Sequence, residues 1–293
     1  MIKLLRGDFT RLFKSKIFWL GVIFMFGFAA AAVYTKWDDA RRYPDYYNPP
    51  DGILLTGGIY ISIALAIFIG IFVGTDYSSG TIRNKHIMGH SRAAMYFSNL
   101  IICVVASLIM HLVHIGVIVG AVNLGIIREF TISAGTVAAQ ILISIFSVAA
   151  VSAILLFVCM LISSRTIGVV TAIILSVVMI ISASSIDNRL REREYTLPGF
   201  NITIKEDGSM LQSPMDLVKN PKYVSGTKRK VLEFFNDLLP INQICQMLYG
   251  KPNADSETTW GDDINAFLPL YSLAMTTVIT TAGVLLFRKK DLK

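Results

Sequence analysis

Two histidines, His111 and His114, are the side chains in the apolar part of the sequence whose type and spacing could do chemistry. Residues three apart share one face of a helix, and imidazole groups inside a membrane can carry a proton or bind a metal ion. The same side chains can instead stay neutral and hydrogen-bond to neighbouring helices. No carboxylate or thiol completes a ligand set on that face, because Cys103 lies two turns away. We therefore assign no metal ligands and keep both interpretations of the pair.

The sequence lacks the common motifs of nucleotide-binding and hydrolytic enzymes. It contains no G-x-x-x-x-G-K-[ST] phosphate loop, no H-E-x-x-H, no C-x-x-C and no G-x-S-x-G. The apolar runs also contain no Asp or Glu, so we expect no buried carboxylate of the kind that a proton-driven carrier uses. These absences predict a chain without catalytic residues and without a bound cofactor, whose energy for any transport comes from elsewhere.

The composition is that of an integral membrane protein. Of the 293 residues, 54% are hydrophobic and only 16% are charged, whereas about a quarter of the residues in an ordinary globular protein are charged. The net charge of +7 comes from positive residues that flank apolar runs rather than from one basic patch. Membrane topology accounts for that distribution, and we expect no nucleic-acid partner.

Six membrane spans follow from the lengths of the apolar runs. A helix that crosses the hydrocarbon core needs about 20 apolar residues. Four runs meet this requirement as single spans, at residues 17–34, 53–73, 95–124 and 267–287. The run at 136–186 is too long for one crossing, and its polar SSRT cluster divides it into two spans at Arg165. The predicted fold is therefore an all-α integral membrane protein with six transmembrane helices, the first five within residues 17–186.

An amphipathic elbow helix is predicted over residues 1–16, before the first span. Its apolar residues recur at helical spacing and its basic residues lie elsewhere, which suits a helix lying on an anionic membrane surface. The apolar positions are Ile2, Leu5, Phe9, Leu12 and Phe13.

The distribution of basic residues predicts the orientation. Six spans place both termini on one side, and the loops and tails of that side hold mostly Lys and Arg, as the positive-inside rule requires of cytoplasmic segments. The loop at 74–93 and the tail at 288–293 are then cytoplasmic. The long segment at 187–266, between spans five and six, is extracytoplasmic. Within it we expect a helical continuation of span five, a hairpin near residues 197–210 and amphipathic helices broken at Pro240.

The loop at 74–93 predicts a short basic helix held between two spans. Gly80 and Gly89 permit backbone angles that other residues resist, and Ser79 or Thr81 can cap a helix beginning there. Such a helix can act as a lever that a partner pushes. On composition alone, an ordinary solvated loop with positive-inside charge fits as well.

The segment TDYSSGTIRNKHIMGHSR resembles the cytoplasmic loop of ABC type-2 transporter permeases. That loop reads acidic-x-x-x-Gly-Thr-aliphatic-basic, followed by an exit similar to Gly-x-Ser-Arg. The family often has Glu at the acidic position, where this sequence has Asp76, and the outer segment here is longer than in the smallest members. On this resemblance the candidate ATPase-coupling residues are Asp76, Gly80, Thr81, Ile82, Arg83, Asn84, Lys85, Gly89 and Arg92.

The resemblance implies a transport subunit without ATPase activity of its own. Its expected partners are cytoplasmic ABC ATPase subunits, which bind ATP and Mg, a second permease copy in a homo- or heterodimer, and membrane lipid. The expected location is a bacterial plasma membrane, with multiple spans and both termini cytoplasmic. The expected substrate is amphipathic, such as a drug or an antimicrobial peptide of the lantibiotic or bacitracin type. The alternatives are a metal- or proton-handling protein centred on His111 and His114, or a sensor that uses the outer segment.

Overall fold

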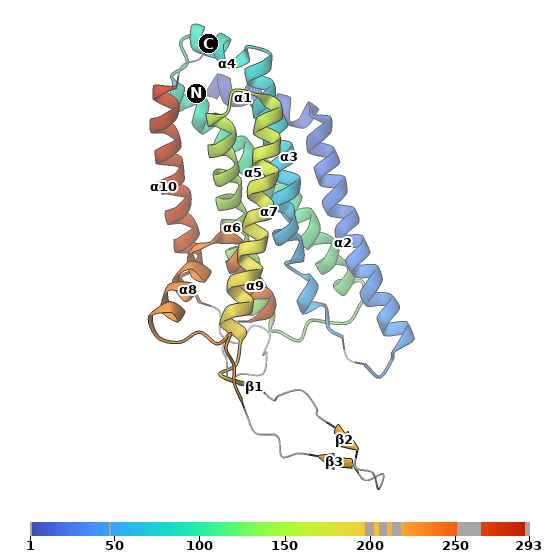
Figure 1. The fold of residues 1–293 in the computed structure, drawn as a ribbon. Coiled ribbons are helices and arrows are strands. Elements are labelled where there is room, and N and C mark those ends of the chain that lie inside the picture. The colour runs from blue at the N-terminus through green and yellow to red at the C-terminus, as the bar shows by residue number, and fades with distance from the viewer. Residues whose placement is uncertain are drawn as a thin grey trace.

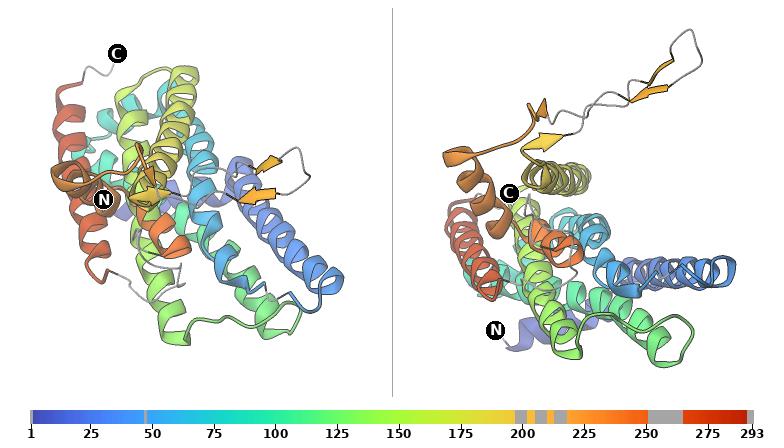
Figure 2. Two further views of the ribbon diagram at one scale, coloured as in Figure 1. Left: turned by 60° about the horizontal axis from the view of Figure 1, so that its bottom comes forward. Right: turned by 90° about the horizontal axis from the view of Figure 1, so that it is seen from below.

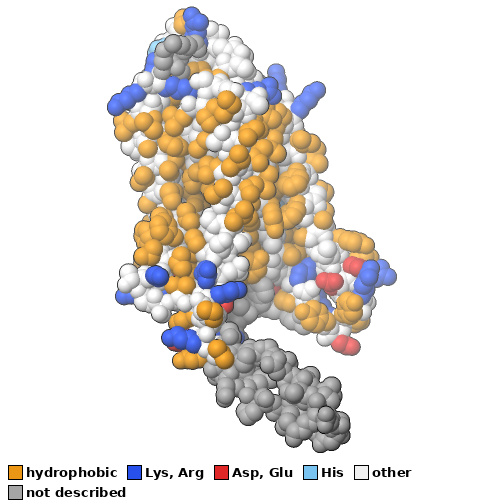
Figure 3. Space-filling view, in the orientation of Figure 1, with side chains coloured by type: hydrophobic (Ala, Val, Ile, Leu, Met, Phe, Trp, Pro, Cys, Tyr) orange, Lys and Arg blue, Asp and Glu red, His pale blue; other side chains and the backbone are white. Residues whose placement is uncertain are grey.

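The computed structural model describes residues 2–46, 48–196, 202–204, 210–212, 218–250 and 265–290. Six of the helices in these residues are long and apolar enough to cross a membrane. They are α2 (Lys16–Arg42), α3 (Thr56–Ser78, preceded by the 3-10 turn η1, Pro50–Ile53), α5 (Arg92–Asn123), α6 (Ala134–Leu161), α7 (Arg165–Arg191) and α10 (Leu268–Lys289). The prediction of an all-α membrane protein with six transmembrane helices is confirmed. Figure 3 shows hydrophobic side chains over the middle of one face, with Lys and Arg towards its ends.

The remaining elements lie at the two ends of this bundle. Helices α1 (Ile2–Lys14) and α4 (Thr81–Ile87) lie at one end, which we call the α4 end (Figure 1). Helices α8 (Gly226–Leu238) and α9 (Pro240–Tyr249) lie at the other, the α9 end. The described residues also form the short strands β1 (Tyr195–Thr196), β2 (Ile202–Ile204), β3 (Met210–Gln212) and β4 (Val218–Lys219). The expected hairpin exists as the antiparallel pair β2–β3, while its Asp-Gly turn lies outside the described residues. The strands β1 and β4 form a second antiparallel pair.

Serine hydroxyls begin four of the spanning helices. Each accepts a hydrogen bond from a backbone N–H of the first turn, which would otherwise lack a partner. These caps are Ser15 for α2, Ser91 for α5, Ser133 for α6 and Ser164 for α7. The last of them confirms the division of the long apolar run at Arg165, because the cap starts α7 directly after the turn that ends α6.

Two helices extend further than the hydropathy predicts. Helix α2 continues past residue 34 to Arg42, where Asp38 and Arg42 form an ion pair one turn apart. Helix α3 does not end near Val73 but at Ser78, because the left-handed backbone that stops it lies at Gly80, with φ 69°. Asp76 is therefore part of the last turns of α3 and not of the loop.

Helix α3 is the central element of the bundle. It contacts α2, α5, α6 and α7, and most of its residues are buried. The two views of Figure 2 show it enclosed by neighbouring helices. Its approach to α7 depends on Gly70 and Gly74: an added Cβ would lie 2.8 Å from the Cα of Val169 and of Arg165, respectively. Small residues spaced by four let helix backbones approach closely in membranes.

Helix α9 inserts between the spans at the α9 end. Every residue from Pro240 to Leu248 is buried, and the helix contacts α3, α6 and α7. The Gln243 side chain accepts hydrogen bonds from Ser147 of α6 and Ser272 of α10, both at 2.7 Å. The break at Pro240 is as predicted, but burial on all sides was not expected, because the sequence pattern indicated an amphipathic helix lying on the bundle.

Replacing Gly74 with alanine should destabilise the bundle, because the new methyl group would meet the backbone of Arg165. Overpacking of this kind costs about 1–3 kcal/mol. Thermal unfolding in detergent would measure the change. The matched control is Gly116→Ala in α5, where an added Cβ meets nothing within 4 Å. Equal melting temperatures of the two variants would contradict the close packing of α3 and α7.

Candidate coupling site

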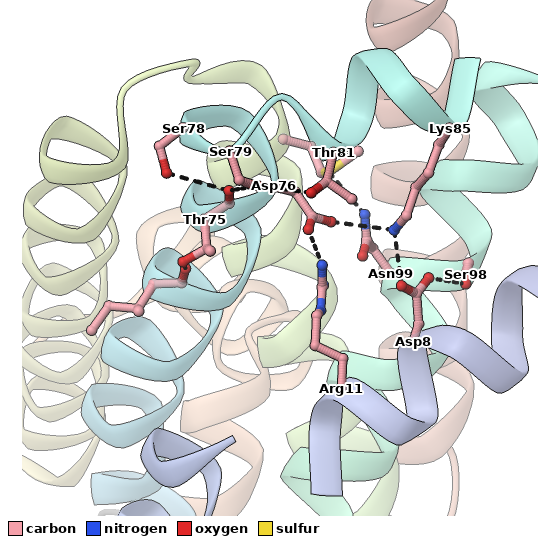
Figure 4. Close-up of polar contacts among 12 residues, drawn as sticks. Asp8, Arg11, Thr75, Asp76, Ser78, Ser79, Thr81, Lys85, Ser98 and Asn99 are labelled. Atoms are coloured by element: carbon pink, nitrogen blue, oxygen red, sulfur yellow. Dashed lines mark hydrogen bonds and ion pairs between the residues drawn. The ribbon is translucent and has the colours of Figure 1, made fainter. Parts of the chain in front are cut away.

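Four charged side chains and one serine form a connected group at the α4 end, which we call the ion cluster. It consists of Asp8 and Arg11 from α1, Asp76 from α3, Lys85 from α4 and Ser98 from α5 (Figure 4). Helix α1 thus meets three consecutive helices, α3, α4 and α5, through charged and polar groups. The longest of these ion-pair separations is 77 residues, between Asp8 and Lys85.

The bonds of the ion cluster form one connected chain. The Lys85 Nζ donates to Asp8 Oδ1 at 2.8 Å and to Asp76 Oδ2 at 3.4 Å. The Ser98 hydroxyl donates to the other Asp8 oxygen at 2.7 Å. Arg11 forms an ion pair with Asp76, and its guanidinium lies 3.7 Å from the centre of the Phe72 ring. Two carboxylates therefore balance two cations.

These carboxylates are deeply buried, which corrects the expectation that the chain buries none. Asp8 is 3% exposed and Asp76 is 1% exposed. Two further aspartates, Asp51 and Asp187, are buried at the α9 end. Each is paired: Asp51 accepts from the backbone of Thr131, and Asp187 from Arg191. The prediction failed because all four lie outside the apolar runs that were searched: Asp8 in the middle of α1, Asp51 in the turn η1, and Asp76 and Asp187 in the last turns of α3 and α7.

Burial changes the proton affinity of the cluster's cations. It lowers the pKa of Lys85 below its ordinary value, while the hydrogen bond to Asp8 and the charge of Asp8 oppose that change. Burial likewise lowers the pKa of Arg11, against the attraction of Asp8. Removing either carboxylate would take away attraction and leave the burial penalty. The cations therefore depend on the carboxylates from the other helices.

Helix α4 has two distinct faces. Ile82 and Lys85, three residues apart, are buried against the bundle. Arg83 and Asn84 are exposed, and so are Ile87 and Met88, with 73% and 68% of their surface accessible. The predicted coupling residues thus divide into an inward set, which holds the helix, and an outward set. Ile87 and Met88 were not among the predicted residues, although two apolar residues at the tip of a basic loop were a signal for an exposed contact.

Glycines define both ends of α4. Gly80 and Gly89 have φ of 69° and 85°, in the left-handed region where glycine is favoured. The predicted cap by Ser79 or Thr81 is wrong: Gly80 occupies the cap position and no side chain bonds to the first turn. The Ser79 and Thr81 hydroxyls instead lie 2.7 Å from each other. The turn is therefore set by backbone conformation.

A second set of contacts, the C-terminal latch, joins the ends of α3, α5, α6 and α10. Arg92 donates to the carbonyl oxygens of Arg288 and Lys290, at 2.7 and 2.6 Å. The Lys290 Nζ donates to the Tyr77 hydroxyl at 2.9 Å and to the Met160 carbonyl at 3.0 Å. Tyr77 also donates to that carbonyl. Arg92, which was predicted to contact the ATPase, is thus hydrogen-bonded to the C-terminal end of α10.

The elbow helix packs on the bundle through one face and leaves part of its predicted membrane-facing stripe exposed. Its buried residues are Leu4, Asp8 and Leu12, spaced four apart, whereas Ile2 and Phe13 are exposed. The spacing was visible in the sequence, with an aspartate in the middle of an apolar stripe. An acidic residue at such a position indicates a buried cation from another element, because an unpaired buried charge is costly.

His111 and His114 form hydrogen bonds with two different neighbouring helices. The Ser144 hydroxyl donates to the Ile141 carbonyl, so it accepts from His111 Nε2 at 2.9 Å. His114 Nε2 accepts from the backbone N–H of Gly57 at 3.2 Å, in the first turn of α3. In the part of the chain that the structure describes, no group of three or more His, Cys, Asp or Glu side chains could hold a metal ion. The contacts therefore favour the structural interpretation of the pair.

Comparison with known protein families gives one match. The model of the family described as ABC-2 family transporter protein matches residues 4–183. The chain belongs to this family. No match was found among curated proteins.

Family membership assigns the general role. The chain is a multi-pass membrane subunit of an ABC transporter and works with an ABC ATPase. The matched residues include most of α1, the α4 loop and the ion cluster, and they end within α7. Helices α8, α9 and α10 lie outside the matched part. The alternative centred on His111 and His114 is not favoured.

Removing a partner from the ion cluster should destabilise the protein. Lys85→Met leaves two buried carboxylates with one cation, and breaking a buried pair costs about 3–5 kcal/mol. Adding Asp8→Asn to that variant should recover part of the loss, because one uncompensated charge disappears. Denaturant titration in detergent would measure all members of this cycle. The control is Asp38→Asn, which breaks the surface pair with Arg42 and should change the free energy of unfolding little. If the effects of Lys85→Met and Asp8→Asn on that free energy simply add, the two side chains are not directly paired.

Lys290 should titrate near neutral pH. Burial lowers the pKa of its amine to about 8, so the neutral, nucleophilic form appears at a lower pH than in an ordinary lysine. Acylation at a series of pH values, followed by mass spectrometry, should give a midpoint near 8 for Lys290. The exposed Lys3 is the internal reference. A pH profile identical to that of Lys3 would contradict the burial of the Lys290 amine in the C-terminal latch.

Proposed function

We propose that the chain is the permease subunit of an ATP-driven exporter, with the α4 end in the cytoplasm. Hydrolysis of ATP, with Mg, takes place on separate ABC ATPase subunits. A second permease copy, identical or related, completes the transporter. Both termini are then cytoplasmic and the complex lies in a bacterial plasma membrane. The observation that carries this proposal is the division of α4 into an exposed face and a face bonded into the ion cluster.

The exposed face of α4 suits an ATPase partner. It combines one cation, Arg83, with two apolar side chains, Ile87 and Met88, on a short helix that projects from the bundle. Apolar anchors surrounded by polar groups are typical of the contacts that contribute most to protein–protein affinity. No nucleotide motif occurs in the chain, which agrees with an ATP site on another polypeptide.

The buried face of α4 transmits the motion of that partner. Lys85 bonds to α1 through Asp8 and to α3 through Asp76, and Asp8 bonds to α5 through Ser98. Separating these groups would leave charges unpaired in a medium of low dielectric constant, at a cost of several kcal/mol. A displacement of α4 therefore moves α1 and the adjoining ends of α3 and α5 together. The C-terminal latch carries the displacement to α6 and α10.

We further propose an amphipathic cargo, such as a drug or an antimicrobial peptide of the lantibiotic or bacitracin type. A groove of 440 Å³ at the α9 end supports this class of substrate. Its lining combines the apolar side chains of Val224, Val231 and Leu232 with Arg189 and Lys228. Phe234 and Phe235 are exposed on the same helix, α8. Surfaces that mix apolar and charged groups suit molecules of the same mixed character.

Charge placed on the outward face of α4 should release the ATPase. Ile87→Asp should weaken binding of the ATPase about fivefold or more, because loss of a central apolar anchor costs over ~1 kcal/mol. The permease itself should remain folded, since Ile87 is 73% exposed. Affinity capture followed by quantitative mass spectrometry would measure the ratio of the two chains.

The matched control places the same charge at the opposite end. Leu124 is 77% exposed and follows α5 at its far end, so Leu124→Asp should leave the ratio unchanged. The proposal fails if Ile87→Asp retains the ATPase as well as wild type does. It also fails if both variants lose the ATPase equally.

A further inference from the structure

A cavity of 320 Å³ lies where α1, α2 and α3 meet at the α4 end. Its polar end is lined by Arg11, Lys14 and Ser15, from the end of α1 and the turn before α2. Its other wall is formed by Phe68, Ile71 and Phe72 of α3. The cavity thus joins a cationic end to an apolar wall that belongs to a transmembrane helix.

Arg11 uses only part of its bonding capacity within the protein. One of its nitrogens, Nη1, is paired with Asp76, and the guanidinium lies on the Phe72 ring. The other two, Nε and Nη2, are buried and have no hydrogen-bond partner in the described part of the chain. An arginine has five N–H donors in a planar fork, and buried donors without an acceptor are destabilising. Both of these nitrogens are covered, so an oxyanion in the cavity would act on Arg11 through the charge of the guanidinium.

Two neighbouring features favour an anion at the same place. Lys14 is exposed and has no ion pair among the described residues. Ser15 caps α2 by accepting from the Phe18 N–H, and the positive end of this 27-residue helix dipole points to the same turn. Asp8 and Asp76 are also near, but Lys85 and Arg11 balance them. Lys14 is the excess cation.

The position of the cavity favours a lipid as its ligand. Helix α1 lies across the end of the bundle with Ile2 and Phe13 exposed, as an interfacial helix lies at the level of the headgroups. Helix α3 runs from there into the apolar band. An acyl chain along Phe68, Ile71 and Phe72 would continue into the hydrocarbon layer.

We propose that this cavity binds one anionic phospholipid, whose phosphate contacts Arg11, Lys14 and Ser15. The lipid shares Arg11 with the ion cluster, so its binding stabilises the arrangement of α1 against α3. The proposal concerns the lipid alone and stands independently of the exporter assignment.

Native mass spectrometry of the purified full-length chain in neutral detergent tests the site. The protein, with its ATPase if this co-purifies, is titrated with phosphatidylglycerol and, separately, with phosphatidylcholine. Wild type should retain one phosphatidylglycerol in preference to phosphatidylcholine. Lys14→Gln should lower the affinity for phosphatidylglycerol about fivefold, the value expected for one lysine near an anionic lipid.

Two further variants distinguish a specific lipid site from general electrostatic attraction between the basic chain and anionic lipid. Lys3→Gln removes the same charge from α1 away from the cavity and should leave the affinity unchanged. Ile71→Trp fills the apolar wall without changing charge and should also remove the bound lipid. Equal retention of both lipids, or equal loss in Lys3→Gln and Lys14→Gln, overturns the proposal. Displacement of phosphatidylglycerol by inorganic phosphate alone would likewise overturn it, because the site would then recognise a free anion.

Discussion

The ion cluster at the α4 end is the constraint on which the rest of the structure depends. Two carboxylates and Lys85 are buried there and Arg11 is half-buried, and a buried charge without its partner is strongly destabilising. The partners come from separate helices: Asp8 and Arg11 from α1, Asp76 from α3 and Lys85 from α4. A helix of seven residues such as α4 is too short to be stable alone. Its position is fixed by Lys85, and its motion is therefore shared with the helices that hold Lys85.

At the opposite end of the bundle, the contacts that hold α9 are mainly neutral, although the ion pair of Asp187 with Arg191 lies there too. Helix α9 is held by its amides and by the hydroxyls of neighbouring spans, with Gln243 bonded to Ser147 and Ser272. Such bonds are individually modest, about 0.5–1.5 kcal/mol each, and exchange with water more readily than buried ion pairs. The two ends therefore differ in character. The α4 end is suited to transmit a displacement, and the α9 end to open and close around an amphipathic molecule.

Much of the fold could be predicted because it is encoded locally. Apolar runs gave the six spans, Arg165 and its preceding serines gave the division of the long run, and Gly80 and Gly89 gave the limits of α4. The ion cluster could not be predicted in the same way, since Asp8 and Lys85 are 77 residues apart and only the packing of four helices brings them together. The burial of α9 was also missed. Its amides are bonded inside the bundle by groups from α6, α10 and α8, among them Ser147, Ser272 and Asn236, and the sequence pattern carries no sign of these partners.

The central claim is that the ion cluster makes α1 and α4 move as one body. Spin labels at the exposed Lys3 and His86 report the distance between these helices by pulsed electron paramagnetic resonance. In the presence of the ATPase, wild type should give one narrow distance distribution both with and without ATP and Mg. Lys85→Met should broaden that distribution. A narrow, unchanged distribution in Lys85→Met, or a wild-type distance that changes with nucleotide, would contradict the account.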